Sequence, residues 1–160
     1  MRQGETVGPV EQSVGYVLKQ AAVALRAAMD AALRPLQLTV PQYSCLELLG
    51  QRPGLSNAEL ARGVFVSRQA MNGVLRGLQQ RGLVTRPASA PQGRALPTQL
   101  TDAGRERLQA ASTAVRAVEK QMLNDLTPSA QRRLLADLTT CATALSGDRA
   151  EEPSDPAEQR

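Results

Sequence analysis

Apolar residues recur at spacings of three and four along most of this chain, which is the period of an amphipathic α-helix. The first such stripe runs through Val14, Leu18, Ala21, Leu25, Met29, Ala32 and Leu36. Because proline cannot continue a helix, the pattern predicts a long helix from Val14 that ends near Arg34, before Pro35. A second stripe, made by Leu108, Ala111, Val115, Val118, Met122 and Leu126, predicts a long helix from residue 101 to residue 126.

Shorter helices are predicted between these two stripes from their capping residues. Thr39 precedes Gln42 by three positions, and Ser56 precedes Glu59 by the same spacing, so each pair forms a capping box. Ser67 is the N-cap expected for a third short helix. These signals predict three helices that end at the glycines of positions 50, 63 and 82.

A small hairpin and a last helix complete the predicted elements. Residues 83–86 are β-prone, residues 87–93 are turn-rich, and residues 95–100 can pair back as a strand that Pro97 restricts to an edge. Thr127 and Pro128 then open a helix with Leu134, Leu135, Leu138, Ala142 and Leu145 on one side. The fold class predicted is mainly α with a small β-wing: a winged helix-turn-helix flanked by long terminal helices.

The charge along the chain points to a polyanionic partner. Residues 1–147 carry 17 basic and ten acidic side chains, whereas residues 148–160 are acidic. Between Leu60 and Arg94 there are six arginines and no acid. A basic region of this kind is typical of nucleic-acid binding, although a solvated basic face without a partner gives the same pattern.

Composition argues against catalysis, a metal site and a bound cofactor. The chain has no His and only two Cys, and Cys45 and Cys141 are far apart and belong to no ligand-spaced cluster. No phosphate-binding loop or nucleophile motif is present. The unpaired cysteines and the charged residues within the first apolar stripe favour a reduced, cytoplasmic chain that does not enter a membrane.

The helix opened by Ser67 is the predicted recognition helix, because the third helix of a winged unit enters the major groove of DNA. Gln69 and Asn72 suit an adenine edge, Arg68 suits guanine or phosphate, and Arg76 suits the backbone. The predicted DNA-contacting residues are Ser67, Arg68, Gln69, Asn72, Arg76 and, at the hairpin tip, Arg94. The alternative for the helix residues is an ordinary polar surface.

The chain resembles the MarR family of bacterial transcription regulators. The resemblance rests on three continuous segments, Leu38 to Tyr43, Leu55 to Ala61 and Gly93 to Gly104. In the recognition region it rests on Val66, Ser67, Leu75, Leu78 and Arg81 to Val84. It implies a triangular homodimer in which the terminal helices interlock and each winged unit reads half of a pseudopalindromic duplex. A monomeric bundle of the terminal helices is the alternative to that dimer.

Two departures from the family pattern concern the DNA-reading parts. The family usually has Asp-Arg-Arg at the wing, where this chain has Gln92, Gly93 and Arg94, so the acid that braces the wing arginine is missing. Gly73 and Gly77 replace polar or charged residues of the recognition helix, and each glycine costs about 1 kcal/mol of helix stability relative to alanine. The two glycines therefore predict a recognition helix that orders fully only on DNA.

The resemblance also implies a small aromatic effector, a carboxylate or a phenol, that binds between the winged unit and the terminal helices. The residues expected to border that crevice are Tyr16, Lys19, Tyr43 and Cys45. Lys19 would pair a carboxylate and a tyrosine hydroxyl would orient it. Core packing of the tyrosines and a solvated position for Lys19 are the alternatives, and oxidant sensing through a cysteine is a further one.

The sequence thus predicts a dimeric, ligand-released repressor, organised as a disordered N-terminus (1–9), dimerisation helices (10–36 and 101–146), a winged helix-turn-helix (37–100) and a disordered acidic tail (147–160). The partners expected are double-stranded DNA, a second copy of the chain and the aromatic effector, with no membrane and no cofactor. A winged-helix protein-interaction module that does not bind DNA is the competing function.

Overall fold

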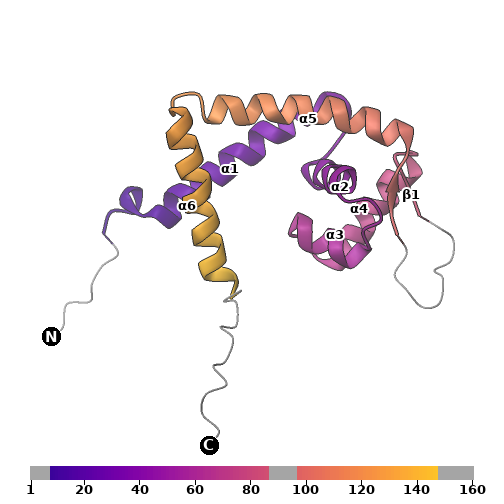
Figure 1. Ribbon diagram of the computed structural model, residues 1–160, viewed down its shortest axis with the longest axis horizontal. Coiled ribbons are helices and arrows are strands. Elements are labelled where there is room, and N and C mark those ends of the chain that lie inside the picture. The colour runs from indigo at the N-terminus through magenta and orange to yellow at the C-terminus, as the bar shows by residue number, and fades with distance from the viewer. Residues whose placement is uncertain (1–7, 87–96, 148–160) are drawn as a thin grey trace, which may run out of the picture. The chain divides into compact units, whose positions relative to one another are not determined.

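The computed structural model describes residues 8–86 and 97–147, which form mainly α-helix (Figure 1). The elements are η1 (Val10–Gln12), α1 (Val14–Leu33), η2 (Arg34–Leu36), α2 (Val40–Gln51), α3 (Asn57–Val64), α4 (Arg68–Gln80), β1 (Val84–Thr85), β2 (Gln99–Leu100), α5 (Asp102–Met122) and α6 (Pro128–Ser146). The chain divides into two compact units, Met1–Gln121 and Met122–Arg160, which are described separately below. The predicted disordered ends, 1–9 and 147–160, fall almost entirely outside the described residues.

The predicted capping residues start the helices of the winged unit. Thr39 Oγ1 accepts from the Gln42 amide at 3.3 Å, and the Gln42 side chain accepts from the Thr39 amide at 3.0 Å. Ser56 and Glu59 form the same reciprocal pair at the start of α3. Each such cap is worth about 1 kcal/mol, so the starts of these helices are fixed by residues three positions apart.

One hydrophobic core holds α2, α3 and α4 against the hairpin, and Figure 1 shows these elements gathered together. Its fully or nearly fully buried members include Leu33, Leu46, Leu49, Leu60, Met71, Leu75, Leu78 and Val84. The start of α5 closes this core: a Cβ added at Gly104 would lie 2.0 Å from the backbone oxygen of Leu83. The contact is so close that only glycine fits there.

The wing is a short antiparallel ladder in which Val84 faces Leu100 and Thr85 faces Gln99. The chain before α3 extends it, because the Thr98 amide donates to Leu55 O at 3.2 Å and the Gly54 amide donates to Thr98 O at 3.1 Å. Pro97 lies just before this pairing and takes no part in the ladder, as expected for a residue without an amide hydrogen.

The predicted end of the second long helix is wrong, because α5 ends at Met122 and not at Leu126. The Leu126 amide closes a turn on Leu123 O at 3.0 Å, and Gln131 Nε2 donates to the carbonyls of Leu123 (3.2 Å) and Leu126 (3.0 Å). These bonds satisfy carbonyls that the helix would otherwise have used. The apolar period continues past Met122, but the turn stops the helix.

The terminal helices leave apolar side chains uncovered. In α1 these are Val14, Tyr16, Val17, Leu18 and Val23. The α6 helix, which is described in full, has no buried residue, and Leu134, Leu135, Leu138 and Leu145 are exposed on it. Of the helices in the described ranges, none has the length and apolarity needed to cross a membrane.

Candidate nucleic-acid interface

The exposed face of α4 carries every predicted base- and phosphate-contacting residue of that helix. Met71, Leu75 and Leu78 point into the core with no exposed surface, and this fixes the rotation of the helix. The residues left exposed are Ser67, Arg68, Gln69, Asn72 and Arg76. The structure therefore brings five of the six predicted DNA-contacting residues onto one face.

The N-terminus of α4 is suited to a phosphate. Ser67 Oγ accepts from the Ala70 amide at 3.0 Å, and the first turn contains Arg68 but no acidic residue. The amides of the first turn that have no carbonyl partner give this end of the helix a partial positive charge. A 13-residue helix with such an end, exposed beside an arginine, favours an anion there.

Asn72 is held by a side chain that the sequence analysis did not single out. The Asn57 side-chain amide, from the start of α3, donates to Asn72 Oδ1. That bond uses one of the two lone pairs of the Asn72 oxygen. It also restricts the orientation of the Asn72 side-chain amide. Asn57 is thus a positioning residue, and the only sequence signal for it is its place directly after the Ser56 cap.

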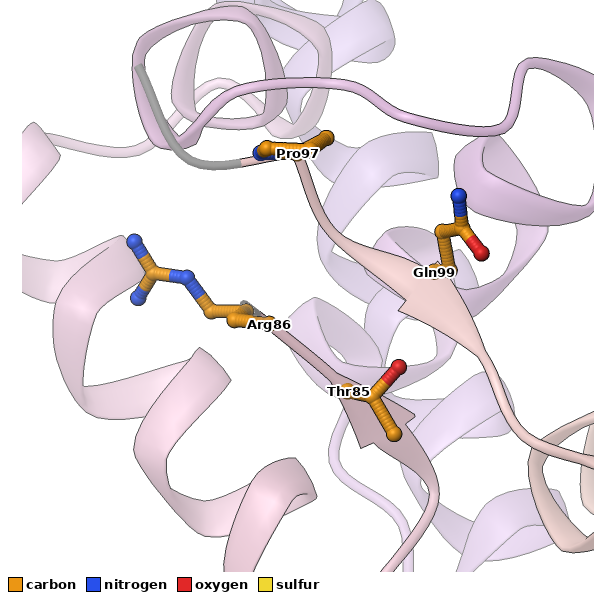
Figure 2. Close-up of a pocket in the computed structure, with 4 residues that line it drawn as sticks. All are labelled: Thr85, Arg86, Pro97 and Gln99. Carbon is orange, nitrogen blue, oxygen red and sulfur yellow. The ribbon is translucent and has the colours of Figure 1, made fainter. Parts of the chain in front are cut away.

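The base of the wing contains an arginine that the sequence analysis counted only as charge. Arg86 follows β1 and, with Thr85, Pro97 and Gln99, lines a pocket of about 330 Å³. Figure 2 shows its guanidinium reaching away from the two strands, beyond the end of β1. Its Nε atom is buried without a hydrogen-bond partner among the described residues. The predicted wing-tip residue, Arg94, lies outside the described residues.

One arginine of the run between Leu60 and Arg94 forms a hydrogen bond within the fold. Arg81 donates to the backbone oxygen of Gln37 at 2.6 Å, where the chain turns through a left-handed residue with φ 55°. Arg107 donates to the oxygen of Leu36 in the same turn. Arg81 therefore supports the connection before α2, and the cations available on the α4 side are Arg62, Arg68 and Arg76, which are exposed.

A polar cluster joins α2 to α5 around Glu47. Its carboxylate accepts from Ser112 Oγ at 2.7 Å, from Gln51 Nε2 at 3.0 Å and from the Tyr43 hydroxyl at 3.2 Å. Burial by itself would raise the pKa of Glu47, but these three hydrogen bonds and nearby Arg116 together hold the pKa below its ordinary value. Burial, and next the Glu47 charge, raise the pKa of Tyr43. The cluster keeps a carboxylate charged in a half-buried position.

The four predicted ligand residues are not brought together in one chain. Tyr43 belongs to the Glu47 cluster, whereas Tyr16 and Lys19 lie exposed in the first turns of α1. Cys45 is completely buried in the core, and its contact with a ligand stays a prediction. Burial also raises the pKa of its thiol to about 12, the opposite of what a reactive thiolate requires.

Comparison with known proteins agrees with this geometry. A MarR family profile matches residues 36–95. The HTH-type transcriptional repressor Rv2887 of Mycobacterium tuberculosis is 49% identical over 119 residues, which cover 74% of this chain and 86% of the repressor. The chain belongs to the MarR family.

Solved structures of that mycobacterial protein share the fold. Its complex with DNA matches 81% of this chain and 97% of its own, at 42% identity and a TM-score of 0.69. Its complex with salicylic acid matches 81% and 96%, at 46% identity and a TM-score of 0.67. The MarR resemblance inferred from the sequence is therefore confirmed, and so is the predicted fold class. The profile match covers α2, α3, α4 and β1, and so includes the exposed polar face of α4.

Proposed function

We propose that this protein is a dimeric, sequence-specific DNA-binding repressor that acts in the cytoplasm without a catalytic step. The observation that carries the proposal is the α4 face, where Arg68, Gln69, Asn72 and Arg76 are exposed over a rigidly packed apolar side. The relation to a mycobacterial repressor, one structure of which is a DNA complex, supports it. A protein-interaction module would not need an acid-free face with guanidinium groups at Arg68 and Arg76.

Each of these four exposed side chains has a role that follows from its chemistry. Gln69 and Asn72 read base edges, and the Asn57 bond restricts the orientations from which Asn72 does so. Arg68 contacts guanine or phosphate, with the N-terminus of the helix beside it. Arg76, two turns further along, contacts the backbone. From the sequence alone, Arg94 is assigned to the minor groove at the wing.

The operator is a pseudopalindrome read by two copies of α4. The exposed apolar side chains of α1 and α6 would be buried against the same helices of a second chain in a two-fold dimer. Two recognition helices related by such an axis read half-sites about one helical turn apart. In this proposal residues 37–100 read the DNA, and residues 10–36 and 101–146 hold the dimer together.

Release from DNA is assigned to a small aromatic carboxylate or phenol. The salicylic acid complex of the mycobacterial relative supports this assignment. In this chain Arg116 supplies a positive charge near the cluster of Tyr43, Glu47 and Ser112. Because Glu47 is itself charged, a ligand carboxylate would pair with Arg116 and not with Glu47, whereas a phenol could donate to the Glu47 carboxylate. Tyr16 and Lys19 remain candidates from α1, and the buried Cys45 remains one from α2. Its raised pKa also disfavours the alternative of oxidant sensing at this position.

Fluorescence anisotropy with a duplex selected by the protein from a random pool tests the proposal. We expect affinity to fall steeply with salt, by about 0.9 in log–log slope for every phosphate neutralised. Salicylate should weaken binding of the wild-type protein to the selected duplex. It should not weaken binding of Arg116→Glu, because this variant lacks the positive charge near the cluster. Failure to select any duplex, or a slope near zero, would favour the protein-interaction module.

A further inference from the structure

Phe65 is the most exposed large apolar side chain of the described residues, with 94% of its surface accessible. It follows α3 directly and lies in the turn that leads to α4. The other exposed apolar side chains of comparable size belong to the terminal helices or the segments beside them. Phe65 is therefore set apart from the dimerisation faces and belongs to the DNA-reading unit.

The backbone of Phe65 is in a conformation that disfavours a bulky side chain. Its φ of 63° is left-handed, a region that glycine adopts freely and that β-carbon-bearing residues rarely occupy. The turn itself is well bonded, since the amides of Phe65 and Val66 donate to the carbonyls of Arg62 and Ala61 at 3.3 and 3.0 Å. A glycine would close this turn with less strain. Within one chain the ring adds no buried apolar surface.

Phe65 is close in sequence to the residues that are proposed to contact DNA. Ser67, the cap of the recognition helix, is two residues further on, and exposed Arg62 and Arg68 lie three residues to either side. Attraction of these guanidinium groups to phosphates brings the turn close to the duplex. When the turn is close to the duplex, the ring can bury its apolar surface only against an apolar group of the DNA. The apolar group that a base pair presents in the major groove is the C5-methyl group of thymine.

We propose that Phe65 is a specificity-determining residue that packs against the C5-methyl group of a thymine in each half-site. The inference rests on the proposed DNA-binding function and adds a base preference to it. Residues of α4 select bases by hydrogen bonds, whereas Phe65 selects thymine by removing apolar surface from water. The backbone strain at Phe65 is thus offset only in the DNA complex, where the ring is buried against the methyl group.

Thymine scanning tests this contact. Each thymine of a duplex selected by the wild-type protein is replaced in turn by deoxyuridine, which keeps the base pair and removes only the methyl group. We expect one symmetry-related pair of positions at which wild-type affinity falls about fourfold per methyl, the factor equivalent to burying one such group. With Phe65→Gly the loss at that pair should be less than about twofold, and Phe65→Leu should retain part of it.

Two controls separate this contact from damage to the fold. Phe65→Gly should leave the melting temperature unchanged or raise it, because glycine suits the left-handed turn. Its affinity for a scrambled duplex should match that of the wild type. Equal thymine profiles for wild type and Phe65→Gly would overturn the assignment of Phe65 while leaving DNA binding intact. Absence of any selected duplex would instead contradict the proposed function.

Discussion

The helices α4 and α6 are both amphipathic, yet they use their apolar sides in opposite ways. In α4, Met71, Leu75 and Leu78 are completely buried, and the exposed side is polar. In α6 no residue is buried, and Leu135 and Leu145 are 70% and 91% exposed. Because an apolar stripe must be covered to stabilise a helix, α4 is stabilised within one chain and α6 requires a second.

This difference separates apolar residues that are buried when one chain folds from apolar residues that are buried when two chains associate. Burying each of the three α4 side chains contributes about 1.5–3 kcal/mol, which a single winged unit obtains on folding. The same contribution from the α6 leucines is available only on association. The winged unit is therefore stabilised within one chain, whereas the terminal helices are stabilised on association.

The largest expected effect is the loss of the dimer. Leu138→Asp places an uncompensated charge within the α6 stripe, and burying such a charge costs several kcal/mol in each chain. We expect the dimer to weaken at least a hundredfold in sedimentation equilibrium, with a comparable loss of affinity for the selected duplex. Thr140→Asp introduces the same charge about 160° away around the helix and should leave both unchanged. A Leu138→Asp protein that stays dimeric at micromolar concentration would show that α6 has another role.

Next in size is the effect of a methyl group at Gly104. The added Cβ of Gly104→Ala collides with the backbone oxygen of Leu83, which cannot rotate away. We expect a loss of about 1–3 kcal/mol or more, the usual cost of overpacking. Gly73→Ala is the matched control, because its Cβ meets no atom of the described residues within 4 Å. That change should stabilise α4 by up to about 1 kcal/mol. Urea unfolding of both variants at one protein concentration measures the contrast.

Those two glycines also mark what could be predicted from the sequence. Helix starts were predictable because Thr39, Ser56 and Ser67 bond to amides within three residues. The face of α4 was predictable because its apolar period is regular. The clash at Gly104 was not, since it depends on Leu83, which lies far from it in sequence.

Missed features share this dependence on distant residues. The end of α5 is set by Gln131 of the next helix, and the apolar period gives no sign of it. The Glu47–Ser112 bond joins residues 65 positions apart, and the Asn57–Asn72 bond joins residues 15 apart. Phe65 was missed for a different reason, because a large apolar residue is ordinarily expected to be buried.

A smaller effect is expected at the polar side of α4. Arg76→Ala removes one phosphate contact per protomer and should weaken binding to all duplexes alike, by about tenfold, with a shallower salt dependence. Gln69→Ala should instead reduce discrimination at particular base pairs, by about 1–3 kcal/mol. Anisotropy titrations on the selected duplex and on single-base variants distinguish the two. A uniform loss with Gln69→Ala and a base-specific loss with Arg76→Ala would mean that the roles are exchanged.

The smallest effect concerns the Glu47 cluster, which links the reading unit to α5. Hydrogen bonds lower the pKa of Glu47 in the folded state, so its contribution to stability is present above the carboxyl pKa of the unfolded chain, about 4.3, and is lost as the pH falls through the folded value. Ser112→Ala removes the shortest of these bonds. Because Glu47 is only partly buried, we expect a loss below about 1 kcal/mol at pH 7, and a smaller loss below pH 4. Thr113→Ala removes a neighbouring hydroxyl that bonds only to its own helix, at Gln109 O, and should show no such pH dependence. Equal losses for Ser112→Ala at pH 7 and pH 3.5 would mean that the hydroxyl contributes packing and not charge stabilisation.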